Sequence, residues 1–329
     1  MINDTQYFNQ FILSYFISPL VIIIIDKVIV IVYTVYILHT RLKEGVFMNV
    51  LQVENLRKEY PTFILNNISF NIPKGFIMGF IGENGAGKTT TLKAMLNIIS
   101  KDGGTVNIFG KNMDEYEIDI KKDIAFMAGK SFYPKRKIKE ITNIFKRFYS
   151  NFDEVLYQQY LKKFNLDQDK KMDELSQGMS LKYSITLALS HHAKLIILDE
   201  PTSGLDPVAR DSLLEIFQSI IEDGEVSILF STHITSDLEK CADYITFIQN
   251  GEIIESLSKD DLIDKYRLIN GASNSLDSIK HDLVSYKKNA FGFTGLIKTD
   301  HLKENSAIRV GVPSLDDIMI YYAERGASV

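Results

Sequence analysis

A glycine-rich stretch, GENGAGKTT from Gly82 to Thr90, constrains what this chain can fold into more than any other feature. It matches the pattern G-x-x-x-x-G-K-[ST], with the apolar run FIMGFI directly before it and the helix-like run TTLKAMLNII at its end. A strand, a glycine-rich turn and a helix in that order form the local structure in which this pattern binds phosphate. The stretch therefore predicts a phosphate site at a strand-to-helix turn.

Each residue type in this loop can be explained by what phosphate binding requires. Glycines have no Cβ, so backbone N–H groups can converge on the close-set oxygens of a phosphate. The helix that begins near Lys88 adds the positive end of its dipole. Lys88 supplies a mobile charge for the β- and γ-phosphates, and the Thr89 hydroxyl is placed for Mg²⁺. The predicted nucleotide contacts are Gly82, Glu83, Asn84, Gly85, Ala86, Gly87, Lys88, Thr89 and Thr90.

A second motif, LIILDE, ends in two carboxylates, Asp199 and Glu200. Its continuous apolar run predicts a strand that is covered on both faces. Asp199 would lie at the carboxyl end of that strand, where open α/β sheets bind ligands, and could hold the Mg²⁺ shell. Glu200 is the natural general base for an attacking water. The alternative, a solvated acidic strand end, is weak in a chain that also carries a phosphate loop.

From Met48 to about residue 262, short apolar runs alternate with helical patterns, which indicates an α/β domain with a largely parallel sheet. Apolar residues at helical spacing predict a helical insert at about 135–175. The Asn250-Gly251 pair predicts a tight hairpin turn. We expect the aromatic residues of the insert to lie in its core: Phe145, Phe148, Tyr149, Phe152, Tyr160 and Phe164.

The tail over 263–329 contains the strand-like pieces LVSYKK and AIRVGV and ends in a helical run. Ser258 with Asp261 predicts a capped helix just before it, and Ser314 with Asp317 predicts a capped helix near its end. The tail is therefore predicted to be a small accessory α+β unit.

The first 47 residues include an apolar stretch, Phe11 to Leu38, that is long enough to span a membrane, since about 20 residues suffice. An Asp-Lys pair lies in its middle, and each such charge costs about 2.5–3.5 kcal/mol at the bilayer centre. Residues 43–45 can be encoded by a ribosome-binding sequence ahead of Met48. We therefore expect 1–47 to be translated leader DNA with a start at Met48, and a membrane anchor is the alternative.

Further motifs stand before and after these two in a fixed order. Over roughly 48–256 the chain therefore resembles the ATP-binding subunit of an ABC transporter. Tyr60 lies ahead of the phosphate loop, where this family carries an aromatic residue that stacks on adenine. LSQGM resembles the family signature LSGGQ, with Gln177 for the first glycine and Met179 for the final glutamine. LIILDE, SGLD and STH then follow in the family's order, and STH resembles the segment with the switch histidine, here His233.

The resemblance implies an ATPase whose catalytic residues are Glu200, His233 and Lys88. It also implies a pair of such domains that sandwich two ATP molecules, each held by the phosphate loop of one and the signature of the other. The signature residues are Ser176, Gln177, Gly178 and Met179, and the residues of the dimer loop are Ser203, Gly204, Leu205 and Asp206. The fold it implies is a P-loop NTPase core with a mostly parallel sheet, a helical insert and an antiparallel β subdomain.

One position departs from the family pattern. Where the family usually carries glutamine at the end of a strand reading like IGYLPQ, this chain has Gly129, followed by Lys130. Glycine has no side chain to touch Mg²⁺ or to orient water, and the loss of one such contact costs about 2–4 kcal/mol in the transition state. We therefore expect slower turnover, but not its loss.

The composition narrows the range of partners. A formal net charge of −5 gives no electrostatic footprint for nucleic acid. The single cysteine, Cys241, excludes an intramolecular disulfide framework and a cysteine-cluster metal site.

The long tail and the amino-acid sequences of the motifs resemble those of the ATPase subunits of bacterial exporters, including those for antibiotics and antimicrobial peptides. This implies a dimeric, peripheral subunit at the cytoplasmic face of the membrane, docked on a separate multi-span permease, with an identical or a different ATPase partner. The alternative is a soluble ABC-type ATPase that acts on ribosomes or nucleic acid. A P-loop kinase or GTPase is not expected to carry a signature and a switch histidine.

Overall fold

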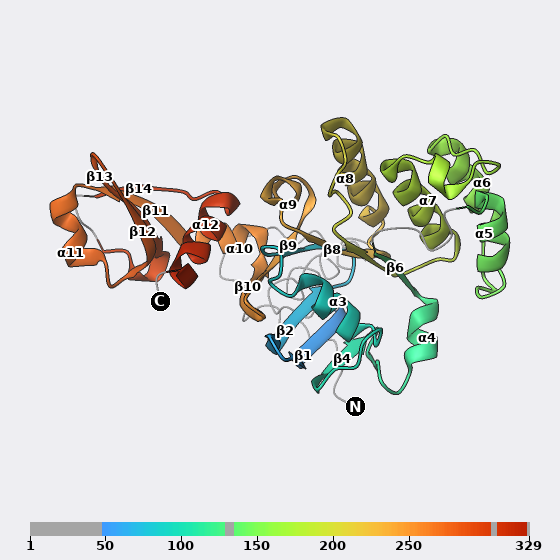
Figure 1. The fold of residues 1–329 in the computed structure, drawn as a ribbon, viewed down its shortest axis with the longest axis horizontal. Helices are drawn as coiled ribbons and strands as arrows, with labels where there is room; N and C mark the ends of the chain where they lie inside the picture. The colour runs from blue at the N-terminus through green and yellow to red at the C-terminus, as the bar shows by residue number, and fades with distance from the viewer. Residues whose placement is uncertain (1–47, 129–134, 304–307, 328–329) are drawn as a thin grey trace, which may run out of the picture. The chain divides into compact units, whose positions relative to one another are not determined.

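The computed structural model describes residues 48–128, 135–303 and 308–327, so the predictions for residues 1–47 and for Gly129 lie outside the described residues. The described residues form three sheets, each covered by helices (Figure 1). In this part of the chain, no helix is both long enough and apolar enough to cross a membrane.

The largest sheet has six strands in the order β10-β9-β3-β8-β7-β6, and every neighbouring pair except β10 with β9 runs parallel. Its strands are β3 (Ile77–Ile81), β6 (Ile124–Ala128), β7 (Leu195–Asp199), β8 (Ser227–Thr232), β9 (Tyr244–Gln249) and β10 (Glu252–Ser258). β3 is buried along its whole length and β7 is buried up to Leu198, which explains their continuous apolar runs. The predicted α/β core with a mostly parallel sheet is confirmed.

Three neighbouring strands of this sheet, β3, β8 and β7, end at the same edge because they are parallel. The chain leaves these strands at Gly82, His233 and Glu200, respectively. Segments that are far apart in the sequence therefore meet at the carboxyl edge of one sheet, which is where an open α/β sheet binds its ligand.

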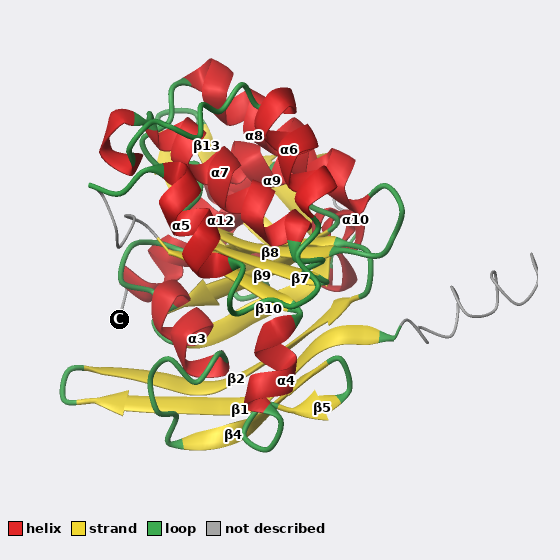
Figure 2. Ribbon diagram, turned by 90° about the vertical axis from the view of Figure 1, so that its right-hand side faces the viewer, coloured by secondary structure: helices red, strands yellow, loops and turns green. Residues whose placement is uncertain are grey.

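A second sheet, in the order β2-β1-β4-β5, is antiparallel throughout, as the predicted β subdomain requires. Its strands are β1 (Asn49–Tyr60), β2 (Phe63–Pro73), β4 (Gly103–Ile108) and β5 (Lys111–Asn112). Helix α3 (Lys88–Met95) shares one apolar cluster with this sheet and with β3 and β7, so it is packed between the two sheets (Figure 2). Helix α4 (Glu117–Lys122) leads from β5 to β6.

The helical insert has a small core of its own. Its elements are α5 (Ile138–Phe145), α6 (Glu154–Lys163) and the short turn η1 (Met172–Glu174), followed by α7 (Gln177–Ser190). The Thr142 hydroxyl lies 2.8 Å from the Tyr157 hydroxyl and 2.9 Å from that of Tyr183, and all three are buried. The prediction that Phe148 is core is wrong, because its side chain is 74% exposed. Helix α5 ends at Phe145, so Phe148 no longer follows the buried face.

Helices α8 (Pro207–Ile221) and α9 (Thr235–Cys241) cover the other face of the central sheet in a cluster that includes Phe217 and Leu238. Asp206 caps α8 by accepting from two backbone N–H groups, with Pro207 in the first position.

The C-terminal part contains the third sheet, β12-β13-β11-β14, which is antiparallel. Its elements are α10 (Lys259–Asp264), β11 (Tyr266–Gly271), η2 (Ser273–Ser275), α11 (Leu276–Ile279), β12 (Leu283–Asn289), β13 (Gly292–Lys298), η3 (Thr299–His301), β14 (Ile308–Gly311) and α12 (Leu315–Ala327). Both predicted caps are confirmed, because Ser258 accepts from the N–H of Asp261 and Ser314 from that of Asp317. The predicted domain boundary at 262 falls inside α10.

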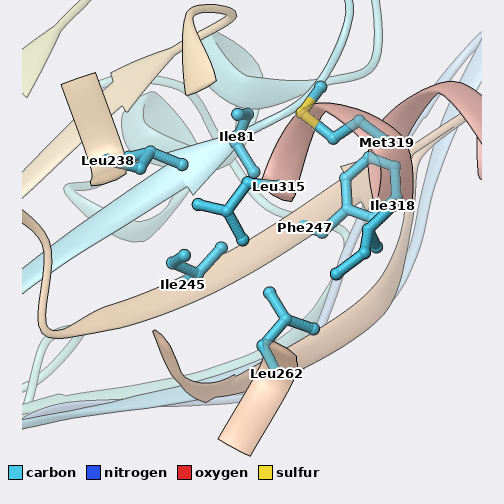
Figure 3. A pocket seen from close by; sticks show the side chains of 8 residues that line it. All are labelled: Ile81, Leu238, Ile245, Phe247, Leu262, Leu315, Ile318 and Met319. Carbon is cyan, nitrogen blue, oxygen red and sulfur yellow. The ribbon is translucent and has the colours of Figure 1, made fainter. Parts of the chain in front are cut away.

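Helix α12 packs against the central sheet (Figure 3). Leu315 and Ile318 lie against Ile81, the last residue of β3, and against Leu238 of α9. The apolar seam between them leaves a void of only about 10 Å³. The Thr235 hydroxyl donates to the Asp316 carboxylate across the same seam.

Candidate functional site

The phosphate loop begins where β3 ends and closes where α3 begins. Lys88, the first residue of α3, is only 5% exposed, and its ammonium donates to the carbonyls of Gly82 (2.7 Å) and Glu83 (3.2 Å). Among the residues that the structure describes, no side chain caps the start of α3, whose N-cap is Gly87. The first amides of the helix are therefore left to a ligand, and the helix dipole favours an anion there.

Glycine is required in this loop largely by neighbouring residues of the same chain. A Cβ on Gly82 would lie 2.3 Å from the carbonyl oxygen of Ile248. Gly87 has a φ of +112°, and a Cβ there would lie 2.6 Å from a methyl group of Leu65. A side chain at either position would therefore displace the loop from the sheet, in addition to any contact with a phosphate.

Thr89 and Asp199 lie together, as the two motifs predict. The Thr89 hydroxyl is 2.8 Å and 3.0 Å from the two carboxylate oxygens of Asp199, and Ser231 donates to the same carboxylate at 2.7 Å. A hydroxyl and a carboxylate beside a phosphate loop are the oxygen ligands that Mg²⁺ takes when substrate phosphates complete its shell. The residues present therefore fit a magnesium ion.

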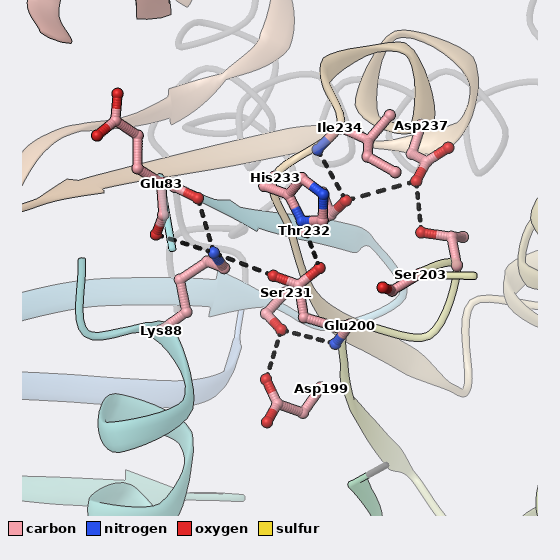
Figure 4. A network of polar contacts seen from close by, with 12 residues as sticks. Glu83, Lys88, Asp199, Glu200, Ser203, Ser231, Thr232, His233, Ile234 and Asp237 are labelled. Atoms are coloured by element: carbon pink, nitrogen blue, oxygen red, sulfur yellow. Dashed lines mark hydrogen bonds and ion pairs between the residues drawn. The ribbon is translucent and has the colours of Figure 1, made fainter. Parts of the chain in front are cut away.

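Glu200 lies between the two other predicted catalytic residues (Figure 4). One carboxylate oxygen is 3.0 Å from the Lys88 ammonium, and the other is 2.9 Å from His233 Nδ1. Oε1, the oxygen beside Lys88, is buried and accepts no hydrogen bond from any described residue, since the ion pair lacks hydrogen-bond geometry. It is an acceptor that a water molecule could satisfy, as a general base requires.

The backbone of Glu200 has a φ of +52°, in the left-handed region that non-glycine residues rarely adopt. The Ser231 hydroxyl holds it there by accepting from the Glu200 N–H at 2.9 Å. Strain of this kind persists only where the surroundings hold the backbone in place, and it is common at active sites.

Tyr60 lies at the end of β1 with 42% of its surface exposed. It lines an open cleft of about 730 Å³ that reaches Gly85 of the phosphate loop. The residues around this cleft are Arg57, Tyr60, Pro61, Thr62, Phe63, Ile64, Asn66, Gly85, Asn250 and Glu252. An aromatic face at one end and a phosphate loop at the other suit the two ends of a nucleotide.

The signature residues lie elsewhere in the structure. Ser176 is the N-cap of α7 and accepts from the N–H of Met179 at 3.2 Å. The Gln177 side chain donates to the Ser203 carbonyl at 2.6 Å. Within the described residues, the signature therefore contacts the dimer loop of its own chain rather than its own phosphate loop, and Ser176 and Gln177 are exposed.

Comparisons with known proteins agree with this geometry. A sequence model of the family described as ABC transporter matches residues 65–203. The lantibiotic transport ATP-binding protein SrtF of Streptococcus pyogenes is 35% identical over 62% of this chain and 89% of its own length. The bacitracin transport ATP-binding protein BcrA of Enterococcus faecalis is 30% identical over 66% of this chain and 72% of its own length. This chain belongs to the ABC transporter family.

A solved ATP-binding subunit of an ABC transporter also matches, with a TM-score of 0.58 and 27% identity over 65% of this chain and 91% of that one. As an ABC ATPase, this chain binds and hydrolyses ATP, which confirms the resemblance found in its motifs. The position of Gly129, where the ABC pattern has glutamine, lies outside the described residues.

Sequence reasoning missed two groups in the site of this ABC ATPase. Ser231 contacts both Asp199 and Glu200. Asp237 accepts from Thr202, which follows Glu200 by two residues, and from Thr232, which directly precedes His233. Ser231 belongs to the STH motif, but nothing in the sequence showed that its hydroxyl contacts both acidic residues. Asp237 had no signal, because acidic residues are common in the first turn of a helix.

Proposed function

We propose that this chain is the ATP-hydrolysing subunit of a bacterial exporter that dimerises on ATP and drives transport through a separate permease. The observation that carries the proposal is the placement of Glu200 between Lys88 and His233, beside the Thr89–Asp199 pair. These groups supply a phosphate clamp, a general base and a metal site at one sheet edge. We also propose that residues 48–262 form the ATP-binding domain and 263–329 an accessory unit.

In this proposal each residue of the site acts on one part of the nucleotide. Tyr60 stacks on the base, and Lys88 leaves Glu200 to bind the β- and γ-phosphates. Glu200 accepts the proton of the attacking water, while His233 orients the carboxylate and reaches toward the γ-phosphate. Thr89 and Asp199 would hold Mg²⁺, which neutralises charge that develops on the phosphates.

The second side of the ATP site is assigned to a partner ATPase subunit. Ser176 and the amides after it form an exposed helix N-terminus, which favours an anion. We assign it to the γ-phosphate bound by the partner, and the loop Ser203–Asp206 to the interface. Because ATP would then contact both protomers, its binding stabilises the closed dimer and its hydrolysis releases it.

Export of an antibiotic or peptide is supported by the relatives, which are named for bacitracin and lantibiotic transport. Within the helical insert, Phe148 and Val155 are exposed at 74% and 69%, and these apolar side chains are our candidates for contact with a permease. We therefore place the protein at the cytoplasmic face of the membrane, bound to a multi-span permease through its helical insert.

The proposal is tested by reconstitution. The chain is purified with the permease of a neighbouring gene, in nanodiscs, and ATP hydrolysis is measured with Mg²⁺, with EDTA and with Glu200→Gln. We expect hydrolysis that needs Mg²⁺ and Glu200 and that rises when the permease is present. An ATPase rate that is the same with and without the permease, together with co-sedimentation of the chain with ribosomes, would instead support the soluble alternative.

A further inference from the structure

A buried carboxylate that the mechanism above does not use lies four residues after the switch histidine. Asp237 in α9 has no exposed surface. It accepts from the Thr202 hydroxyl at 2.6 Å and forms an ion pair with Arg210. It also accepts from the Thr232 hydroxyl at 3.4 Å (Figure 4). A buried charge is tolerated only when such partners replace its water shell, so this arrangement is demanding to build.

The partners of Asp237 come from three segments of the ATP site. Thr202 is two residues after Glu200, and Thr232 is directly before His233. Arg210 lies in α8, which begins at the end of the dimer loop, and it also donates to Ser236 at 2.8 Å. The Asp237 carboxylate thus connects the loop after Glu200, the segment before His233 and helix α8, which follows the dimer loop.

We infer that Asp237 is a positioning residue for ATP hydrolysis, which fixes the loop after Glu200 relative to His233. Glu200 has a left-handed backbone that the chain must hold in place. The Ser231 hydroxyl holds it on the side of β8, and Thr202 ties the following turn to α9. Because Thr202 and Thr232 donate to the same oxygen of Asp237, movement of the loop away from His233 breaks a shared contact.

This inference rests on the proposed roles of Glu200 and His233. A merely structural ion pair would lower stability and leave the chemistry of the folded protein unchanged. A positioning role lowers kcat while the affinity for ATP is retained, since Asp237 does not touch the phosphate loop. The split between kcat and KM therefore separates the two roles.

The decisive variants are Thr202→Val and Thr202→Ser, assayed as full chains. Valine keeps the shape and removes the hydroxyl, whereas serine keeps the hydroxyl. We expect Thr202→Val to lower kcat about tenfold with KM for ATP within about twofold, which corresponds to one lost bond to a charged group. Thr202→Ser should recover most of the kcat. Asp237→Asn should show the same split with a larger loss of kcat, provided that it folds.

Two controls make the result decisive. Glu239→Gln removes a charge from an exposed position of the same helix, and its kcat should equal that of the parent. Glu200→Gln tests the proposed base separately. If Glu200→Gln abolishes hydrolysis while Thr202→Val keeps the parent kcat, the base is right and the positioning role is wrong. Equal loss in the valine and serine variants would also overturn the inference, because the hydroxyl would then be irrelevant.

Discussion

The two sets of residues predicted to bind ATP, the phosphate-loop end and the signature end, are built in different ways. At the first, Glu200 contacts both Lys88 and His233, at the edge where the parallel strands β3, β7 and β8 end. At the second, Ser176 is exposed at the start of α7, and its hydroxyl binds only the N–H of its own first turn among the described residues.

The difference teaches which part of the ATP site one chain can complete. The strand ends bring the carboxylate of Glu200, the ammonium of Lys88 and the imidazole of His233 to one place, where the carboxylate is paired with both of the other groups. The helix end presents amides and a dipole, and the described first turn of α7 contains no acidic residue, so its binding energy becomes available when an anion arrives from outside. The following predictions break or sharpen this contrast.

The largest effect is expected at the phosphate-loop end. Lys88→Ala removes the cation that the loop holds at 5% exposure, so hydrolysis should fall by about 10³-fold or more, as for the loss of a phosphate clamp. Steady-state ATPase rates and nucleotide binding by calorimetry measure this. Lys93→Ala, in the last turn of the same helix, is the matched control. A rate for Lys88→Ala within about twofold of the parent would contradict the phosphate-loop assignment.

A second prediction links the two ends. Glu200→Gln should reduce hydrolysis by about 10²–10³-fold while ATP still binds, so the closed dimer should accumulate and the mass seen by light scattering should double. Adding Ser176→Arg should abolish that dimer, because a cation and a long side chain would fill the helix end, while the monomer should still bind ATP. Any neighbouring ATPase subunit must be present, in case the dimer is mixed. A dimer that survives the double change would show that Ser176 is not at the interface.

A smaller effect is expected at the base end of the cleft. Tyr60→Ala should weaken ATP binding by about 1–3 kcal/mol, which is the range for one aromatic stack. Tyr60→Phe should be nearly silent, because the ring carries the interaction. Binding of a fluorescent ATP analogue measures both variants. Equal losses would point to the hydroxyl and away from stacking.

The smallest effect is expected at the signature end within one chain. Gln177→Ala removes the bond to the Ser203 carbonyl, which is exposed and is therefore worth about 0.5–1.5 kcal/mol at most. Hydrolysis should change by less than about tenfold and monomer stability by even less. An effect as large as that of Lys88→Ala would mean that Gln177 acts on the nucleotide directly, and the contrast between the two ends would fail.

Much of the ATP site could be predicted because its motifs are short and contiguous. The loop from Gly82 to Thr90 and the pair Asp199–Glu200 each contain their own chemistry, and parallel strands bring them together by rule. Ser231 and Asp237 could not be found in this way, because their importance depends on hydrogen bonds to residues about thirty positions away. Such contacts are set by strand order and side-chain packing, which leave no local pattern.

The errors have similar causes. Phe148 fits the helical spacing of the insert, but a helix end is among the hardest features to find from sequence, and α5 ends before it. The glycines of the phosphate loop were predicted from the needs of a phosphate. Gly82 and Gly87 are also required by Ile248 and Leu65, which only the packed structure brings close.

The docking of α12 has a consequence for folding cooperativity. Leu315 and Ile318 belong to the same apolar cluster as Ile81 of β3 and Leu238 of α9, so the proposed accessory unit and the proposed ATP-binding domain share one hydrophobic interior. Elements that share a core are expected to unfold in one transition rather than two. Cys241, the only cysteine, lies in this cluster, and burial raises the pKa of its thiol to about 12. The thiol is therefore protonated and shielded at neutral pH, and its reactivity would report on whether this shared core is intact.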